Sequence, residues 1–342
     1  MSIANWKAIL FSSIGILVLM GLSGCEKAPQ KMESLNIASA NQPSNALTFI
    51  AQEKGFFRDA GLEVSIEDFP SGKRALQDGF LNPDKKFDLA ITSDMPFSSA
   101  IHKGHSLVTF AHIFSTDDVN RIVARKDRNI FQLPDLAGHT IGTQENSAVH
   151  YFLTRILEAY NLNNSEVNVK FMAAEALPTA LSKGSIDAFS MREPYVTQAR
   201  DMIGEDNLSI LGAYGVYHQY DVLVSAPEII QMKVPAFEKF VSGLLQAQDF
   251  AINHPEEALD IVAKKLNISV QSLKKTLSLN DLKIGLQQGL LMTLESQQAW
   301  LASLDSQKMA HNSNQFTDFF YFPLLESVAP ELIAIIRPNS GS

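Results

Sequence analysis

Short apolar runs alternate with segments of helical spacing along the chain, and this alternation decides the predicted fold. Runs rich in Val, Ile, Leu and Phe predict strands at 35–38, 62–66, 87–92, 107–114, 139–143, 166–171, 186–190 and 208–211. Helical patterns fill the segments between these runs. Strands that alternate with helices are typical of parallel α/β architecture. We therefore predict two α/β halves that follow one another in the chain.

Two extended runs join the predicted halves. Residues 120–125 cross into the second half and residues 220–225 return to the first, after which the pattern is mainly helical out to residue 336. We expect one lobe at 35–115 plus 222–336 and a second lobe at 116–221. Ligands in open α/β sheets bind beyond the carboxyl ends of the strands, so a ligand cleft is expected between the lobes.

The first residues indicate export. Lys7 is the only charge before an apolar run at 8–20, which is too short to span a bilayer comfortably. Leu22-Ser23-Gly24-Cys25 resembles the lipobox of bacterial lipoproteins, and Cys25 is the only cysteine, so no internal disulfide can form. We predict a signal peptide at 1–24, a lipidated tether at 25–34 and anchoring in the cell envelope, on the periplasmic face of a membrane or the outer face of the cell membrane.

Composition narrows the classes of partner. The chain has 342 residues, of which 46% are apolar and 19% charged, as in ordinary globular proteins. The net charge of -9 becomes -10 once Lys7 is removed with the signal peptide, which argues against nucleic acid. No catalytic motif is present, so we expect neither an enzyme nor a cofactor. His102 and His105 lack companion ligands, so no metal site is expected.

The stretch 136–151 carries the most specific local signal. Its apolar run enters a predicted helix at Asn146-Ser147, and both residue types are favoured N-caps. The first amides of such a helix can hold an anionic ligand, although an ordinary capped helix has the same pattern. The turns after the predicted strands, at 41–45, 93–95, 146–148 and 191–193, together form the candidate pocket.

These turns also carry a family resemblance. The chain from 35 to 336 resembles the substrate-binding proteins of nitrate, sulfonate and taurine ABC importers, whose relatives bind thiamine-precursor pyrimidines. The matching segments are Ala51-Gln52-Glu53-Lys54-Gly55-Phe56-Phe57, Phe87-Asp88-Leu89-Ala90-Ile91, Leu136-Ala137-Gly138-His139-Thr140-Ile141-Gly142 and Glu193-Pro194-Tyr195. The resemblance implies a type II periplasmic binding protein fold with two α/β lobes and a ligand cleft.

The resemblance also implies which residues line the cleft. These are Gln42, Pro43, Ser93, Asp94, Asn146, Ser147, Arg192, Glu193 and Tyr195. The residues themselves leave alternatives open. Arg192 could bind an anion through two N–H groups, or form an ion pair with neighbours of Glu193 or with Asp187. Glu193 and Asp94 could accept from a ligand or cap a helix, and Tyr195 could stack on a flat ligand or simply pack.

Two departures from the family pattern bear on the ligand. Asn146 stands where the family often has Gly, and Asn tolerates the left-handed backbone that Gly would supply. Arg192-Glu193 stands where sulfonate and taurine binders tend to carry Trp-Asp. Arg192 and the start of the helix at Ser147 favour an anion, whereas Glu193 and Tyr195 favour a flat ring that bears an amine.

We therefore expect a monomeric solute-binding lipoprotein of an ABC importer. It would capture a small anion such as a sulfonate, nitrate or taurine by lobe closure and deliver it to the permease and ATPase subunits. One alternative is a binder of a thiamine-precursor pyrimidine or another flat aromatic ligand. Another is a lipoprotein that senses a ligand and signals to a membrane receptor.

Overall fold

The computed structural model describes residues 32–162, 166–304 and 313–337. The expected signal peptide, Cys25 and most of the expected tether lie outside these residues. The first strand begins at Glu33, so Glu33 and Ser34, which we expected in the tether, belong to a sheet.

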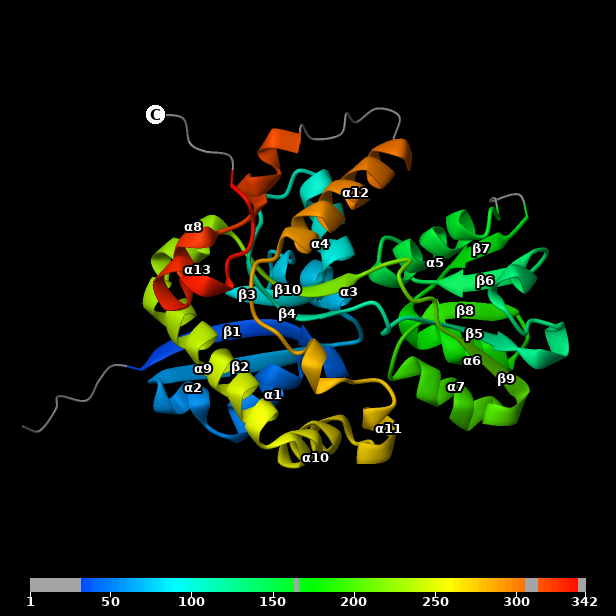
Figure 1. The fold of residues 1–342 in the computed structure, drawn as a ribbon, viewed down its shortest axis with the longest axis horizontal. Helices are drawn as coiled ribbons and strands as arrows, with labels where there is room; N and C mark the ends of the chain where they lie inside the picture. The colour runs from blue at the N-terminus through cyan, green and yellow to red at the C-terminus, as the bar shows by residue number, and fades with distance from the viewer. Residues whose placement is uncertain (1–31, 163–165, 305–312, 338–342) are drawn as a thin grey trace, which may run out of the picture. The chain divides into compact units, whose positions relative to one another are not determined.

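The first sheet has five strands in the order β2-β1-β3-β10-β4 (Figure 1). Their bounds are β1 Glu33–Ala40, β2 Leu62–Phe69, β3 Leu89–Ser93, β4 Val108–Thr116 and β10 Gln219–Ser225. β1 pairs in parallel with β2 and β3, whereas β10 lies antiparallel between β3 and β4. The extended run expected at 220–225 does return to the first half, and it enters the sheet there.

The second sheet repeats this plan in the order β7-β6-β8-β5-β9. Its strands are β5 Arg121–Arg125, β6 Thr140–Thr143, β7 Asn168–Phe171, β8 Ala188–Met191 and β9 Leu208–Leu211. β6 is parallel to β7 and β8, and β5 lies antiparallel between β8 and β9. Both sheets are therefore mixed, because each includes the strand that has just crossed from the other half.

Helices pack against both sheets (Figure 1). Their bounds are α1 Ala46–Glu53, α2 Phe56–Asp59, α3 Gly72–Arg74, α4 Asp94–His102, α5 Ala148–Ala159, α6 Leu177–Ser182, α7 Tyr195–Ile203, α8 Pro227–Met232, α9 Val234–Asn253, α10 Pro255–Leu266, α11 Val270–Lys274, α12 Gln288–Leu304 and α13 Phe322–Val328. The helix expected at 73–80 is α3 followed by a π-helical segment, Ala75–Phe80. Gly55 follows α1 in the left-handed conformation (φ 77°), as expected of a residue that ends a helix.

Apolar side chains form separate cores in the two halves. In the first half, phenylalanines of the sheet and of α1, α2 and α9 pack together, with the rings of Phe57 in α2 and Phe240 in α9 stacked at 5.1 Å between centroids. In the second half, neighbouring residues of β5 face opposite ways, so Ile122 and Val123 belong to different clusters. The second sheet is thus buried on both faces, as sheets with helices on both sides are.

Helix α12 contacts both halves. Gln298 donates to the carbonyl oxygen of Ser98 in α4 at 2.6 Å, while Ser296 exchanges a hydrogen bond with the hydroxyl of Tyr151 in α5 at 2.8 Å. Leu301 belongs to a core cluster of the second half. The C-terminal region therefore supports the junction of the two halves as well as the first lobe.

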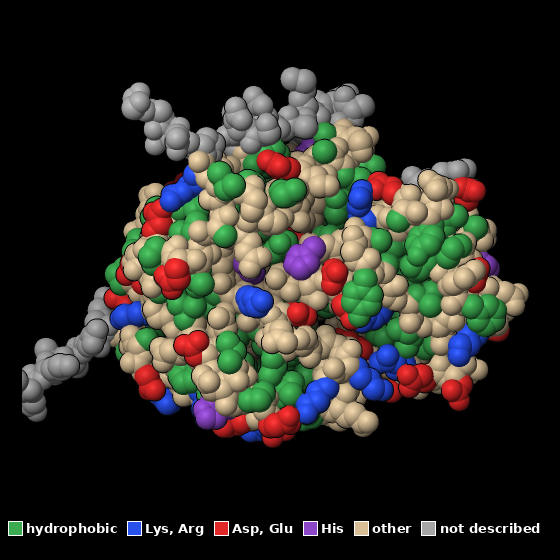
Figure 2. All heavy atoms as spheres, viewed as in Figure 1, with side chains coloured by type: hydrophobic (Ala, Val, Ile, Leu, Met, Phe, Trp, Pro, Cys, Tyr) green, Lys and Arg blue, Asp and Glu red, His purple; other side chains and the backbone are tan. Residues whose placement is uncertain are grey.

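On the face that Figure 2 shows, acidic and basic side chains are interspersed and form no broad patch of one sign. No helix within residues 32–162, 166–304 and 313–337 is both long enough and apolar enough to cross a membrane.

Candidate functional site

The two halves meet at the turns that follow their strands, and two small cavities lie there. The first is lined by Gln42, Pro43 and Ser44 after β1 and by Arg192 and Glu193 after β8. Its volume is about 10 Å³, which is room for about one water molecule.

The second cavity is also lined by Arg192 and has a similar volume, about 10 Å³. From the first half it is lined by Ser71, Lys73 and Ser93, and from the second by Gln144, Ser147 and Arg192. Arg192 is the residue that lines both cavities. Arg192 therefore lies where the two lobes meet. We call the region formed by Arg192 and the two cavities the cleft.

Direct hydrogen bonds join the lobes across the cleft. The hydroxyl of Ser71 donates to the side-chain oxygen of Gln144 at 3.2 Å, and Lys73 donates to the backbone carbonyl of Glu145. Burial lowers the pKa of the Lys73 amine. Since the remaining space holds about one water in each cavity, the lobes must separate before an organic ligand can enter.

The start of α5 is the capped helix that the sequence predicts. Ser147 accepts a hydrogen bond from the amide of His150 at 3.3 Å, in the N-cap geometry. Asn146 adopts a left-handed backbone (φ 49°), which Asn tolerates better than most residues. Its amide donates to Nδ1 of His150 at 3.2 Å. Ser147 thus reaches the cleft, whereas Asn146 lines a different cavity, described below.

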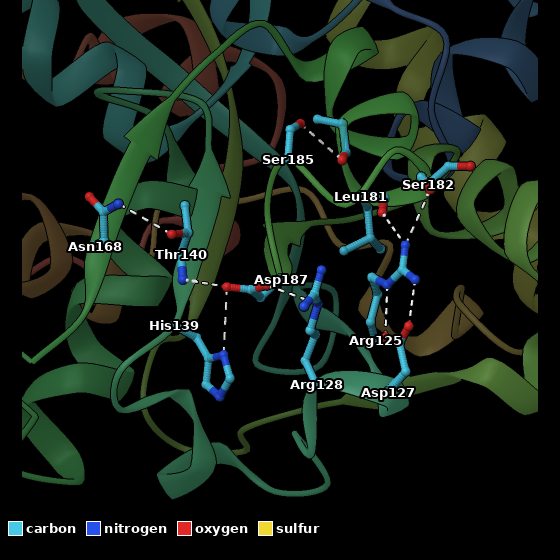
Figure 3. Close-up of polar contacts among 11 residues, drawn as sticks. Arg125, Asp127, Arg128, His139, Thr140, Asn168, Leu181, Ser182, Ser185 and Asp187 are labelled. Atoms are coloured by element: carbon cyan, nitrogen blue, oxygen red, sulfur yellow. Dashed lines mark hydrogen bonds and ion pairs between the residues drawn. The ribbon is translucent and has the colours of Figure 1, made fainter.

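Arg192 has a partner that the sequence did not indicate. Its Nη1 lies 3.5 Å from Oδ1 of Asp221 in β10, and both side chains are buried. Asp187, which we considered as its partner, is engaged elsewhere (Figure 3). Asp187 accepts from the amide of Thr140 at 2.9 Å and pairs with Arg128 at 3.3 Å. The alternative in which Arg192 pairs with Asp187 is therefore wrong, because Asp187 belongs to a network within the second lobe.

Glu193 and Tyr195 are both engaged within the protein. The carboxylate of Glu193 accepts from the amide of Thr197 in α7 at 3.0 Å and pairs with Arg200 at 3.4 Å. Glu193 therefore satisfies the start of a helix, which was the simpler of its two expected roles. The ring of Tyr195 packs in a core cluster, and burial raises the pKa of its hydroxyl to about 12.

Asp94 lies inside the protein and lines neither cavity. Its carboxylate accepts from the hydroxyl of Tyr217, from the amide of Tyr220 at 2.8 Å and from the side-chain amide of Gln297 at 3.0 Å. Burial raises the pKa of Asp94 to about 7, although these three hydrogen bonds oppose the shift. Asp94 thus joins α4 to β10, to α12 and to the segment before β10, and it is not an N-cap: α4 begins at Asp94 itself.

Several buried polar atoms around the cleft have no hydrogen-bond partner among the described residues. They are Nε2 of Gln42, Oγ of Ser44, Oγ1 of Thr92, Oδ1 of Asn120, Nη1 of Arg192 and Oδ2 of Asp221. Buried polar groups in folded proteins are nearly always satisfied. The group contains donors and acceptors and both signs of charge, so it suits a polar ligand.

Six of the nine expected site residues line at least one of the two small cavities, and three do not. Five line the first or second cavity together with Arg192: Gln42, Pro43, Ser93, Ser147 and Glu193. Asp94, Asn146 and Tyr195 line neither. Asp221 was not predicted because it stands inside an apolar strand run, and Ser71 and Lys73 were not predicted because their turn carries no recognised motif. Gln144 lies within the stretch 136–151 that the sequence did single out, but only Asn146 and Ser147 were chosen there.

A larger cavity of about 630 Å³ is lined by residues of the second half and by Trp300 and Leu304 of α12. Asn146, His150, Phe171 and Trp300 are among its lining residues. The ring of His150 contacts Phe171 and Trp300 at centroid distances of 4.8 and 5.1 Å. Burial lowers the pKa of His150 to about 4, so its imidazole is neutral near pH 7.

In the part of the chain that the structure describes, no group of three or more His, Cys, Asp or Glu side chains could hold a metal ion. The candidate site therefore consists of Arg192 and its polar neighbours.

Two curated proteins are similar in sequence to this chain. A protein of Haemophilus influenzae named for thiamine biosynthesis is 28% identical over 221 residues, which are 63% of this chain and 68% of that protein. A protein of Escherichia coli named as an aliphatic sulfonates-binding protein is 26% identical over 137 residues. That match covers 40% of this chain and 42% of the relative, so it spans less than half of its length.

Solved structures share the fold. The alkanesulfonate-binding protein of Xanthomonas axonopodis pv. citri bound to MOPS has a TM-score of 0.68 at 16% identity, covering 86% of this chain and 99% of that one. The architecture is thus the periplasmic binding protein fold that we expected. A desulfurization enzyme also shares it, with a TM-score of 0.62 at 15% identity, covering 87% of this chain and 99% of that one. The fold alone does not separate binding from catalysis.

The family resemblance drawn from the sequence is confirmed. The pattern of the NMT1/THI5-like family matches residues 42–258, which is more than half of the chain. This protein therefore belongs to the NMT1/THI5-like family.

Proposed function

We propose that this protein is the solute-binding component of an ABC importer and that it captures a small anionic solute in the cleft. The observation that carries the proposal is Arg192, a buried guanidinium that lines both cavities. Its Nη1 is paired with Asp221 at 3.5 Å but has no hydrogen-bond partner among the described residues. A guanidinium binds carboxylate, sulfonate or nitrate oxygens through paired N–H groups. The sulfonate-binding relative in Escherichia coli supports this class of ligand.

The mechanism would be lobe closure. Arg192 and Ser147 come from the second lobe, whereas Gln42, Ser44 and Ser93 come from the first. A ligand that touches both sets binds the closed form more tightly than the open form and so shifts the equilibrium towards closure. The hydrogen bond between Ser71 and Gln144 would form in the same step. The closed form would then dock on the permease and release the solute there.

The protein would be attached to the membrane by a lipid on Cys25, with residues after it acting as a tether. This proposal rests on the sequence Leu22-Ser23-Gly24-Cys25 alone. Metabolic labelling with a fatty acid, compared between the wild type and Cys25→Ser, tests it. Equal labelling of both proteins would reject it.

A second candidate ligand is a thiamine-precursor pyrimidine, which the relative in Haemophilus influenzae favours. Oδ2 of Asp221, a residue that pairs with Arg192, and Oδ1 of Asn120, a residue linked to Asp221 through Gln219, have no hydrogen-bond partner among the described residues and could accept from ring amines. Both candidates share the same cleft and the same closure. They differ in whether Arg192 or these acceptors supply most of the binding energy.

Thermal-shift measurements on the mature chain, followed by calorimetry, would separate the candidates. Ethanesulfonate, 2-aminoethanesulfonate, nitrate, an aminopyrimidine and aromatic acids form the panel. A ligand that binds only the folded form raises its stability by about 2.7 kcal/mol at a concentration of 100 Kd. Recovery of the bound compound unchanged is expected, because we propose binding without turnover.

The role of Arg192 is tested with Arg192→Lys, which keeps the charge near Asp221 but loses the two-pronged geometry. We expect at least tenfold weaker binding of the anion, which is about 1.4 kcal/mol. Arg155→Ala, on the surface of α5, is the matched control because its partner is Glu158 on the same helix. Unchanged affinity in the Arg192 variant would reject the proposed site.

A further inference from the structure

Arg192 and Asp221 form an ion pair that joins the two lobes. Arg192 follows β8 of the second sheet and Asp221 lies in β10 of the first. Their side chains are 7% and 0% exposed, and the N–O distance of 3.5 Å exceeds the roughly 2.7–2.9 Å of a good charge-assisted hydrogen bond. The pair is therefore buried, but its charged groups are too far apart to form a strong hydrogen bond.

Asp221 is poorly satisfied by the rest of the protein. Its Oδ1 accepts from the side-chain amide of Gln219 at 2.8 Å, while Oδ2 has no hydrogen-bond partner among the described residues. The nearby groups do not compensate its charge. Asp94 is a second buried carboxyl group whose ionisation is disfavoured by the charge of Asp221, and Tyr217 donates to Asp94. Arg192 is thus the cation on which Asp221 depends.

A ligand that takes Arg192 disturbs this balance. When an anion binds the guanidinium, Asp221 loses its ion-pair partner Arg192 and keeps a buried Oδ2 that has no hydrogen-bond partner among the described residues. Removing one partner of a buried ion pair is strongly unfavourable because the other charge is left uncompensated. A simple anion that binds Arg192 therefore leaves the buried charge of Asp221 uncompensated. A ligand that also carries a cation avoids that cost.

We propose that Asp221 determines the class of solute: the cleft takes a small molecule that carries a protonated amine beside its anionic group, with the amine pairing with Asp221 while Arg192 holds the anion. This inference rests on the proposed function, because it concerns the same cleft. It assigns a specificity role to a residue of the return strand that the motifs of the sequence did not mark. The same pairing discriminates against anions that lack the amine.

The test compares two pairs of probes that differ by the amine. They are 2-aminoethanesulfonate against ethanesulfonate, and 3-aminopropanoate against propanoate, titrated by calorimetry into the mature chain at pH 7.5. We expect the amine-bearing member of at least one pair to bind at least about tenfold more tightly, because a site built around a buried acceptor rejects the analogue without the donor. This comparison needs only the wild type.

The variant Asp221→Asn then assigns the preference to the carboxylate. We expect it to weaken binding of the amine-bearing probe and to leave the simple anion bound as well or better, so the ratio falls to within about threefold. Asp118→Asn is the control, because Asp118 pairs with Arg121 and with Tyr214 and lines neither cavity. Retention of the wild-type ratio in Asp221→Asn would overturn the inference.

The outcomes separate the inference from the proposed function. Equal binding of both members of each pair by the wild type would overturn the inference while solute binding stands. Binding of nitrate or an aminopyrimidine, with no binding of the four probes, would do the same. Failure of the whole panel to bind would overturn the proposed function, and the inference with it.

Discussion

The hydroxyl of Tyr195 in the second lobe donates a hydrogen bond to the carbonyl oxygen of Pro70 in the first lobe, at 2.8 Å. Tyr195 is thus anchored by its ring in one lobe and by its hydroxyl to the other. The family resemblance had placed Tyr195 at the cleft, where it could stack on a flat ligand or simply pack. The contact instead indicates a role in holding the lobes together.

Tyr195→Phe removes that hydrogen bond and keeps the packing of the ring. A typical hydrogen bond contributes about 0.5–1.5 kcal/mol, so we expect the closed form to be disfavoured by roughly that amount and ligand affinity to fall about two- to tenfold. Distance measurements between labels on the two lobes would report the same shift. Tyr160→Phe, at the exposed end of α5, is the control. A change in affinity of equal size in both variants would argue against an effect of the contact with Pro70.

Substitution of Asn146 tests whether the stability of the turn before α5 depends on a left-handed backbone conformation. Its φ of 49° lies in the left-handed region, which costs most residues about 1–2 kcal/mol and glycine nothing. We expect Asn146→Gly to leave the free energy of unfolding nearly unchanged and Asn146→Ala to lower it by about 1 kcal/mol. Urea denaturation of the two variants checks this. Equal stabilities would mean that the side chain of Asn146, and not its backbone, sets the preference.

Gly142 in β6 is required by close packing. A methyl group at this position would lie 2.7 Å from Cδ1 of Ile186 and 2.8 Å from Cδ2 of Leu177. Both neighbours are buried side chains, so Gly142→Ala should destabilise the protein by about 1–3 kcal/mol through overpacking. Ile186→Val removes the nearer methyl group and should restore part of that loss in the double variant.

The double-mutant cycle measures this coupling directly. Ile186→Val alone should cost about 0.5–1.5 kcal/mol, as such truncations do. If the two substitutions lower the free energy of unfolding by the simple sum of their separate effects, the contact with Ile186 is not what constrains Gly142.

The fold could be predicted from the sequence because local patterns agreed with it. The alternation of apolar runs and helical segments located the strands of both sheets, and Gly55 marked the end of α1. The pairing of β10 within the first sheet was not readable, since strand order depends on contacts between residues far apart in the chain. The same limit applies to the π-helical segment at Ala75–Phe80.

The site was predicted less completely, for a physical reason. Residues after strands, such as Gln42 and Arg192, could be placed at one edge of their sheets from their position alone. Asp221 could not, because a single acid within an apolar strand gives no sign of which side chain it will face. Asp94 looked like a cap or a ligand residue, yet its actual partners are donors on three other segments.

Asp94 also predicts a dependence of stability on pH. Burial raises the pKa of Asp94 from 3.8 to about 7 in the folded protein, so between these values the folded state holds a proton that the unfolded chain has released. The contribution of this group to the free energy of unfolding is therefore fully present below about pH 4 and is lost as the pH rises through about 7. Urea denaturation at intervals from pH 4 to 8 measures it.

Asp94→Asn removes the titration and supplies the comparison. The amide still accepts from Tyr217 and Gln297 but turns a donor towards the amide of Tyr220, so we expect the variant to be less stable by about 1–3 kcal/mol at low pH. The gap between wild type and variant should narrow as the pH rises from about 4 to 7, because only the wild type loses stability through this group. A gap that stays constant across that window would show that the hydrogen bonds to the carboxylate outweigh its burial and keep Asp94 ionised.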